Sequence, residues 1–168
     1  MKRFLLLLSV LFLTCASVLA GESKSLAGTG EIPLNLQENP DLIASRILYA
    51  FILKEEGLEN SSAVKKGIIT RENTFADYVD LNNDGISEIV GYSTSQYKSK
   101  KGRPFYILKK EGDEYIKIDF VLKIDPNKPV SLLRDRHRGF SSIRVWDFKG
   151  NQPITVKYDG THYSIMRL

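Results

Sequence analysis

Residues 75–92 have the sequence FADYVDLNNDGISEIVGY, in which two apolar runs flank an acidic segment that contains one glycine. Short β-branched and aromatic runs bounded by turn residues are typical of strands. Outward from this stretch, the same pattern predicts strands at 104–109, 115–123, 130–134, 143–148, 154–158 and 162–166, beside those at 75–79 and 87–93. The sequence therefore predicts a β-rich domain whose successive strands pair in antiparallel fashion.

One helix is expected ahead of these strands. Asn39 is a candidate N-cap, Pro40 suits the first helical position, and Gly57 ends the helix. Apolar residues at helical spacing predict a stripe that packs on the sheet: Leu42, Ile43, Ile47, Phe51 and Leu58, with Leu48 or Ile52 beside them. We therefore expect an α+β fold, an antiparallel β-meander of about seven or eight strands covered by one N-terminal amphipathic helix.

The first twenty residues are typical of a secretory signal peptide. Lys2 and Arg3 precede an apolar run of about ten residues, whereas a membrane span needs roughly twenty. Small residues near its end predict cleavage after Ala20, and hence a periplasmic or secreted protein. The alternative is a lipoprotein signal with Cys15 as the lipidated residue, which would tether the domain to a membrane.

Composition divides the rest of the chain into two parts. Residues 21–36 are rich in Gly, Ser and Lys and are expected to form a flexible leader, and residues 37–168 are expected to form a single globular domain. The chain has 24 Lys and Arg against 20 Asp and Glu, but two of the basic residues belong to the predicted signal peptide. Because the mature protein is then only weakly basic, no nucleic-acid partner is expected.

The acidic segment at 80–88 has the donor pattern of a hard-cation site. Oxygen-bearing side chains occupy loop positions 1, 3, 5 and 9, and glycine at position 6 permits a sharp turn. The expected ligands are Asp80, Asn82, Asp84, Ile86 through its backbone carbonyl, and Glu88 directly or through a water. This pattern favours calcium over magnesium, which demands stricter octahedral geometry. The alternative is an ion-free turn in which the side chains accept hydrogen bonds from backbone amides.

The segment resembles the calcium loops of EF-hand and dockerin proteins. It is more similar to the D-x-N-x-D-G-x-x-E loops that join two strands in FG-GAP-type repeats of secreted proteins, because its flanks are predicted strands. Position 12 is Gly91, where an EF-hand has a bidentate glutamate, so a helix–loop–helix sensor is not expected. The resemblance covers residues 75–92 and implies a calcium loop between two strands.

More broadly, the chain is similar to small exported bacterial proteins that join one such loop to two further features. These are an Arg/His-Gly-aromatic segment, here at 136–140, and a closing Tyr-Asp-Gly-x-x-Tyr hairpin, here at 158–163. The likeness implies export and the α+β class, and it implies no activity.

Two combinations of residues suggest catalysis. Asp135, His137 and a serine, Ser141 or Ser142, lie close together in sequence, but a solvated basic turn explains them better, because catalytic triads assemble in space rather than in sequence. In a hydrolase acting on cell-wall or extracellular material, either calcium would polarise the substrate or paired carboxylates such as Asp77 and Glu88 would act as acid and base.

Basic residues form two groups along the mature chain and would make a basic face if the fold joined them. The groups are Lys98, Lys100, Lys101, Arg103, Lys109 and Lys110, and then Arg134, Arg136, Arg138, Arg144 and Lys149. Solvated strand edges are the alternative. Trp146, in a period-two run, is predicted to be in the core.

These observations favour an exported, non-enzymatic binding or accessory protein of the bacterial envelope with a structural calcium loop. Its partner would be an anionic envelope component or another protein, and it would contact a membrane only if Cys15 is lipidated. The alternatives are the hydrolase and an inhibitor or immunity protein that blocks a secreted enzyme.

Overall fold

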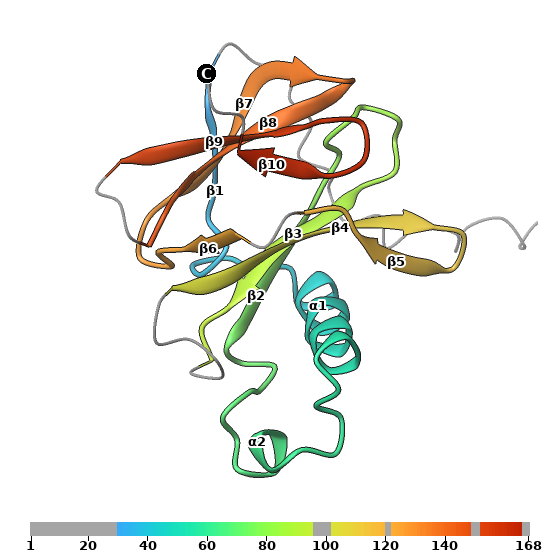
Figure 1. The fold of residues 1–168 in the computed structure, drawn as a ribbon, viewed down its shortest axis with the longest axis vertical. Helices are drawn as coiled ribbons and strands as arrows, with labels where there is room; N and C mark the ends of the chain where they lie inside the picture. Colours follow the sequence, from blue (N-terminus) through green and yellow to red (C-terminus); the bar gives the residue numbers. More distant parts are fainter. Residues whose placement is uncertain (1–29, 96–101, 120–121, 149–151, 166–168) are drawn as a thin grey trace, which may run out of the picture.

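The computed structural model describes residues 30–95, 102–119, 122–148 and 152–165. Within these residues the fold consists mostly of antiparallel β-sheet, with ten strands in two five-stranded sheets and two helices (Figure 1). The prediction of antiparallel strands is confirmed. The expected single meander of seven or eight strands differs from the observed arrangement, in which strands β1 to β10 divide between two sheets.

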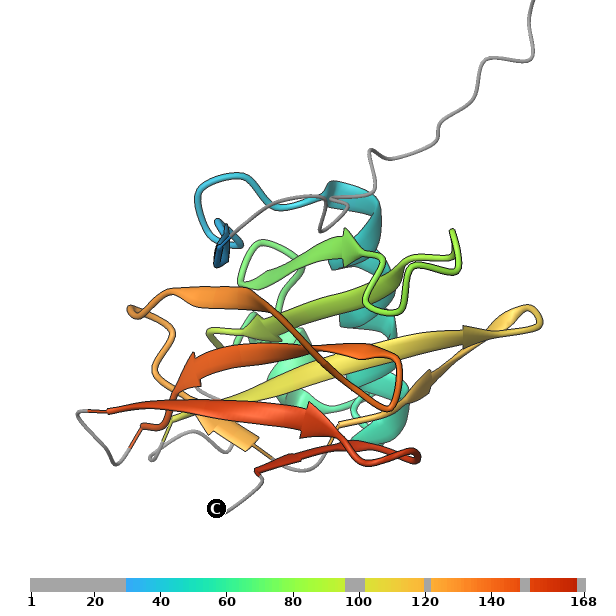
Figure 2. The ribbon, with the colours of Figure 1, turned by 90° about the horizontal axis from the view of Figure 1, so that it is seen from above.

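Sheet A consists, in spatial order, of β1 (Ile32–Leu34), β7 (Val130–His137), β8 (Phe140–Trp146), β9 (Pro153–Tyr158) and β10 (Tyr163–Ile165). Sheet B consists of β2 (Thr74–Val79), β3 (Glu88–Ser93), β4 (Arg103–Glu111) and β5 (Glu114–Lys117), with β6 (Leu122–Ile124) paired to the other end of β4. The helices are α1 (Leu42–Glu55) and α2 (Ser62–Lys65). In Figure 1 sheet A, sheet B and α1 follow one another as three layers, and in the view from above α1 lies behind the strands (Figure 2).

The predicted strand at 115–123 is in fact two short strands of sheet B, β5 and β6. β5 pairs with the far end of β4 and β6 with its near end, both on the edge of β4 opposite β3. Between these two strands, the backbone N–H of Tyr163 in sheet A donates to the carbonyl of Ile118 at 2.6 Å. The chain then continues into β7, which begins the main part of sheet A.

The larger core lies between the two sheets. Val90 and Ile107 of sheet B face it, as do Leu132, Ile143 and Val156 of sheet A, and each of these side chains is at most 3% exposed. These positions alternate along their strands with outward-facing residues, as expected of sheets packed face to face.

The helix α1 packs on the opposite face of sheet B. Its N-cap is Asp41 rather than the predicted Asn39, and the Asp41 carboxylate accepts hydrogen bonds from the N–H groups of Ile43 and Ala44 at 2.8 Å. Leu48 and Ile52 are buried against the sheet.

Half of the predicted apolar stripe faces away from the sheet, because α1 is rotated relative to that prediction. Leu42 and Ile43 are 79% and 51% exposed, and Phe51 is half-buried. The rotation follows from contacts with β2: the Ser45 hydroxyl accepts from the N–H of Ala76 at 3.0 Å, and the N–H of Asp41 donates to its carbonyl. The helix start therefore covers the outer edge of β2.

The described end of the predicted flexible leader contains strand β1. Ile32 pairs with Leu132, and Leu34 and Leu36 are 4% and 2% exposed. Apolar residues at every second position from 32 to 36 explain this burial. The predicted signal peptide and Cys15 lie outside the described residues, and within the part described no helix is long and apolar enough to cross a membrane.

Candidate functional site

The acidic loop joins the end of β2 to the start of β3. Asn83 and Gly85 have φ angles of 61° and 84°, in the left-handed region that asparagine and glycine adopt most readily. These two residues reverse the chain sharply enough to turn the alternate side chains of the loop inward.

Three of the predicted ligands converge on the backbone amides of this loop. The carboxylate of Asp80 accepts hydrogen bonds from the N–H groups of Asp84 and Gly85 at 3.2 and 3.1 Å. Asn82 Oδ1 accepts from the N–H of Asp84 at 2.9 Å, and Asp84 Oδ1 accepts from the N–H of Ile86 at 2.7 Å. Asp80, Asn82 and Asp84 thus lie on the inside of one turn.

The last predicted ligand, Glu88, is buried at the base of the loop. Its side chain is 1% exposed, and its Oε2 accepts from the N–H of Leu81 at 2.9 Å. Burial, and then the negative charges of Asp84 and Asp80, raise the pKa of Glu88 to about 7. The side chain of Ile86 is 55% exposed, and its predicted contribution is the backbone carbonyl.

The loop also contacts the β7–β8 hairpin of sheet A. The carbonyl of Leu81 accepts from the N–H of Ser141 at 2.7 Å, and Arg136 Nη1 donates to the carbonyl of Asn82 at 3.3 Å. On the other side of Ser141, the hydroxyl of Tyr163 donates to its carbonyl at 2.7 Å. The conformation of the loop is therefore coupled to the contact between the sheets.

The donor set of this loop is entirely oxygen, which suits calcium. Across the described residues no group of three or more His, Cys, Asp or Glu side chains is arranged to hold a metal ion, and here the amide of Asn82 occupies one of the inward positions. An oxygen that accepts one N–H keeps a further lone pair for a cation. The observed hydrogen bonds therefore fit both the calcium loop and the ion-free turn.

The residues predicted for catalysis do not form an accessible site in this conformation. Asp77 and Glu88 are 8% and 1% exposed, so a cell-wall polymer has no access to them. His137 Nδ1 lies 2.6 Å from the carbonyl of Tyr158, and Asp135 accepts from Ser142 rather than from the histidine, at 2.9 Å. A triad is therefore not assembled around His137.

The predicted basic face is only partly described. Lys98, Lys100, Lys101 and Lys149 lie outside the described residues. Arg144 is ion-paired with Glu31, and Arg136 bonds to the loop, so both contact their own chain. Trp146, predicted to be in the core, is half-buried, and Lys128 Nζ lies 5.3 Å from its ring centroid.

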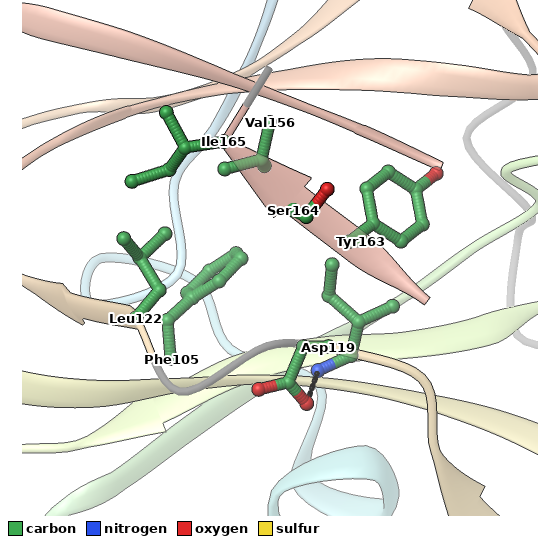
Figure 3. A pocket seen from close by; sticks show the side chains of 8 residues that line it. Phe105, Asp119, Leu122, Val156, Tyr163, Ser164 and Ile165 are labelled. Carbon is green, nitrogen blue, oxygen red and sulfur yellow. Dashed lines mark hydrogen bonds between the residues drawn. The ribbon is translucent and has the colours of Figure 1, made fainter. Parts of the chain in front are cut away.

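A second carboxyl group with a raised pKa, that of the partly buried Asp119, was not predicted from the sequence. Burial raises its pKa to about 7, although the N–H of Ile107, which donates to Oδ1 at 3.1 Å, and the charge of Lys117 both lower that pKa (Figure 3). Asp119 lines a cavity of about 10 Å³ next to Phe105 and Tyr163, which is room for about one water. An acid inside the apolar run 116–122 was the available sequence signal.

Two larger hollows lie at the surface. One, of about 220 Å³, lies between residues 34–38 and the turn at 126–130. Tyr92 and Pro126 both line it, and the Tyr92 hydroxyl donates to the carbonyl of Pro126 at 3.3 Å. The other, of about 780 Å³, is a groove between α1 and β5. Neither hollow contains a residue of the acidic loop.

Comparisons with known proteins identify no relative. No family model, no curated protein and no solved structure matches the chain. The resemblance of residues 75–92 to an FG-GAP-type loop stays a prediction based on the residues themselves.

Proposed function

We propose that this chain is an exported, non-enzymatic binding or accessory protein of the bacterial envelope, and that its loop at 80–88 binds a structural calcium ion. The observation that carries the calcium site is the convergence of the side-chain oxygens of Asp80, Asn82 and Asp84 on the inside of one turn, with Glu88, 1% exposed, at its base. The negative charges of Asp84 and Asp80 raise the pKa of the buried Glu88, and a divalent cation would relieve both that repulsion and the cost of burying Glu88.

The proposed ligands are the carboxylates of Asp80 and Asp84, the Oδ1 of Asn82, the carbonyl of Ile86, and Glu88 directly or through a water. When bound, calcium supplies charge neutralisation and a fixed turn. The residues themselves connect the loop to sheet A, through the hydrogen bond between the Ser141 N–H and the Leu81 carbonyl. A calcium ion would therefore stiffen the junction of the two sheets, and millimolar affinity suffices outside the cell.

Three further features support export and a binding role. Residues 1–20 have the pattern of a signal peptide, with lipidation of Cys15 as the only predicted link to a membrane. The candidate acid–base pair is buried, which favours binding over hydrolysis. The basic side chains predicted to contact an anionic envelope component or protein partner include Arg134 and Arg138 near the tip of the β7–β8 hairpin, both exposed.

Thermal unfolding in excess EDTA and in millimolar calcium tests the calcium site. A hundredfold excess of calcium over its Kd adds about 2.7 kcal/mol, which corresponds to a rise in Tm of roughly 10 °C for a domain of this size. Asp84→Ala should abolish the rise. Asp113→Ala, which removes a negative charge from the exposed β4–β5 turn, should leave it unchanged.

A wild-type Tm that is the same in calcium and in EDTA would establish the ion-free turn instead. A rise that Asp113→Ala abolishes as fully as Asp84→Ala would show a non-specific effect of charge.

A further inference from the structure

The groove between α1 and β5 has two walls of regular secondary structure. Ile47 and Phe51, one turn apart on α1, form the apolar wall, and Ile43, 51% exposed, continues the same row toward the helix start. The opposite wall is β5, which lies beside β4 on the side next to α1 (Figure 1). Half of the apolar stripe that was predicted to be core therefore borders this groove.

The groove runs along the edge of β5 rather than across its face. All of its residues, Glu114–Lys117, line the groove, whereas a cavity over one face of a strand meets only alternate side chains. Among the described residues, β5 pairs with β4 and with no other strand. The groove thus gives access to a strand edge.

The register identifies which backbone groups are available. The N–H of Ile118 donates to the carbonyl of Ile107, and Lys109 is paired with Ile116. Since the hydrogen-bonding direction alternates along an antiparallel strand, the N–H and C=O groups of Tyr115 and Lys117 point away from β4, toward the groove.

The two outer edges of sheet B, at β2 and at β5, differ in what covers them. At β2, the backbone groups of Ala76 are occupied by Asp41 and Ser45 from the start of α1. At β5, the groove separates the edge from the helix, and the ion pair of Lys117 Nζ with Glu55 Oε1 at 3.2 Å spans it. Open edges are where an extended segment of another chain adds as a strand.

The charges of the groove define the chemistry of such a segment. Glu55, Glu59 and Glu114 line it together with Lys54 and Lys117, and Lys117 already neutralises Glu55. The lining is therefore net acidic around an apolar wall. Complementarity requires basic side chains for the acids and apolar side chains for Ile47 and Phe51.

We propose that the groove binds an extended peptide segment of a partner protein, with alternating apolar residues and flanking Lys or Arg, which pairs with the open edge of β5. This inference rests on the proposed binding role and names the class of partner. Main-chain hydrogen bonds to Tyr115 and Lys117 give affinity, and the apolar wall and the glutamates give specificity.

The test is selection from a displayed library of random ten-residue peptides on the purified protein. The enriched peptides should carry apolar residues at every second position with Lys or Arg beside them. On binding of the best peptide, the amide protons of Tyr115 and Lys117 should become protected from hydrogen exchange.

Variants locate the peptide. Phe51→Asp should weaken binding about tenfold or more, and Phe148→Asp, at a 46% exposed phenylalanine outside the groove, should not. Because Phe51 is half-buried, Glu59→Lys provides a second variant at an exposed site, and it should weaken binding in low salt more than in high salt.

Several outcomes would overturn the proposal. The first is that no peptide is enriched, and the second is that the selected peptide binds the Phe51→Asp variant as tightly as the wild type. The third is that the enriched peptides carry apolar residues at helical spacing. The fourth is a dimer in sedimentation that Glu114→Lys dissociates, because the occupant of the groove would then be a second copy of this chain. The calcium test is independent, since Asp84→Ala should bind the selected peptide as the wild type does. Failure of the calcium site and failure of the groove are therefore distinguishable.

Discussion

Glu88, which is buried, and Asp119, which is partly buried, both have a pKa raised to about 7, but their neighbours differ in charge. After burial, the neighbouring charges of Asp84 and Asp80 raise the pKa of Glu88 further. The charge of Lys117 instead lowers the pKa of Asp119. A similar pKa therefore arises at Glu88, among excess negative charge, and at Asp119, which has Lys117 beside it. We expect an added cation to stabilise only the site of Glu88.

The largest expected effect comes from Asp119. A carboxyl group with a raised folded-state pKa stabilises the fold at low pH, and that stability is lost as the pH rises from about 4 to about 7. The cost at pH 8 is about 4 kcal/mol. Asp119→Asn should remove much of it, because an amide oxygen can still accept from the N–H of Ile107. Urea unfolding of the wild type and of Asp119→Asn at pH 4 and pH 8 measures the free energy of unfolding. If the variant is destabilised equally at both pH values, the prediction is wrong.

Glu88→Gln should have the next largest effect, and it separates the two groups. In EDTA at pH 8 the variant should gain about 3 kcal/mol, because the buried charge is removed. It should also lose the stabilisation by calcium, whereas Asp119→Asn should keep it. If both variants respond to calcium as the wild type does, Glu88 is not a ligand.

Calcium itself should change the pH dependence of stability. A bound cation lowers the pKa of Glu88, so the gain of about 2.7 kcal/mol at a hundredfold excess over Kd should be present at pH 8 and shrink toward pH 5, where protons compete. The difference in Tm between calcium and EDTA, measured across this range, tests the sign. A gain that grows toward low pH would exclude coordination by Glu88.

The smallest expected effect is that of Tyr163→Phe. This change removes the buried hydrogen bond from the tyrosine hydroxyl to the carbonyl of Ser141 and should cost about 1 kcal/mol. Because Ser141 also contacts Leu81, the variant should lower calcium affinity slightly as well. Isothermal titration with calcium detects that coupling, and an unchanged Kd would show that the loop is independent of this contact.

Local sequence patterns anticipated most strands, because each strand has its own alternation and turn residues. The inward side chains of Asp80, Asn82 and Asp84 also followed from local spacing, since loop geometry is set within a few residues. That this loop binds calcium stays a prediction.

Features that depend on distant residues were not predictable in this way. The pairing of β1 with β7 and the burial of Glu88 near the contact between Leu81 and Ser141 both arise from segments far apart in the chain. The rotation of α1 likewise depends on hydrogen bonds to Ala76, and apolar spacing alone offered two adjacent faces of the helix.

The pairing of β1 with β7 also sets an order of events during folding. Ile32 meets Leu132, one hundred residues later, so the most N-terminal described strand belongs to the sheet built from the C-terminal half. A chain that emerges N-terminus first must keep β1 unpaired until β7 arrives, and contacts of such long sequence separation form slowly. Once formed, this pairing closes the chain into a loop that spans most of the domain, which ties the N-terminal segment to the last sheet to be completed.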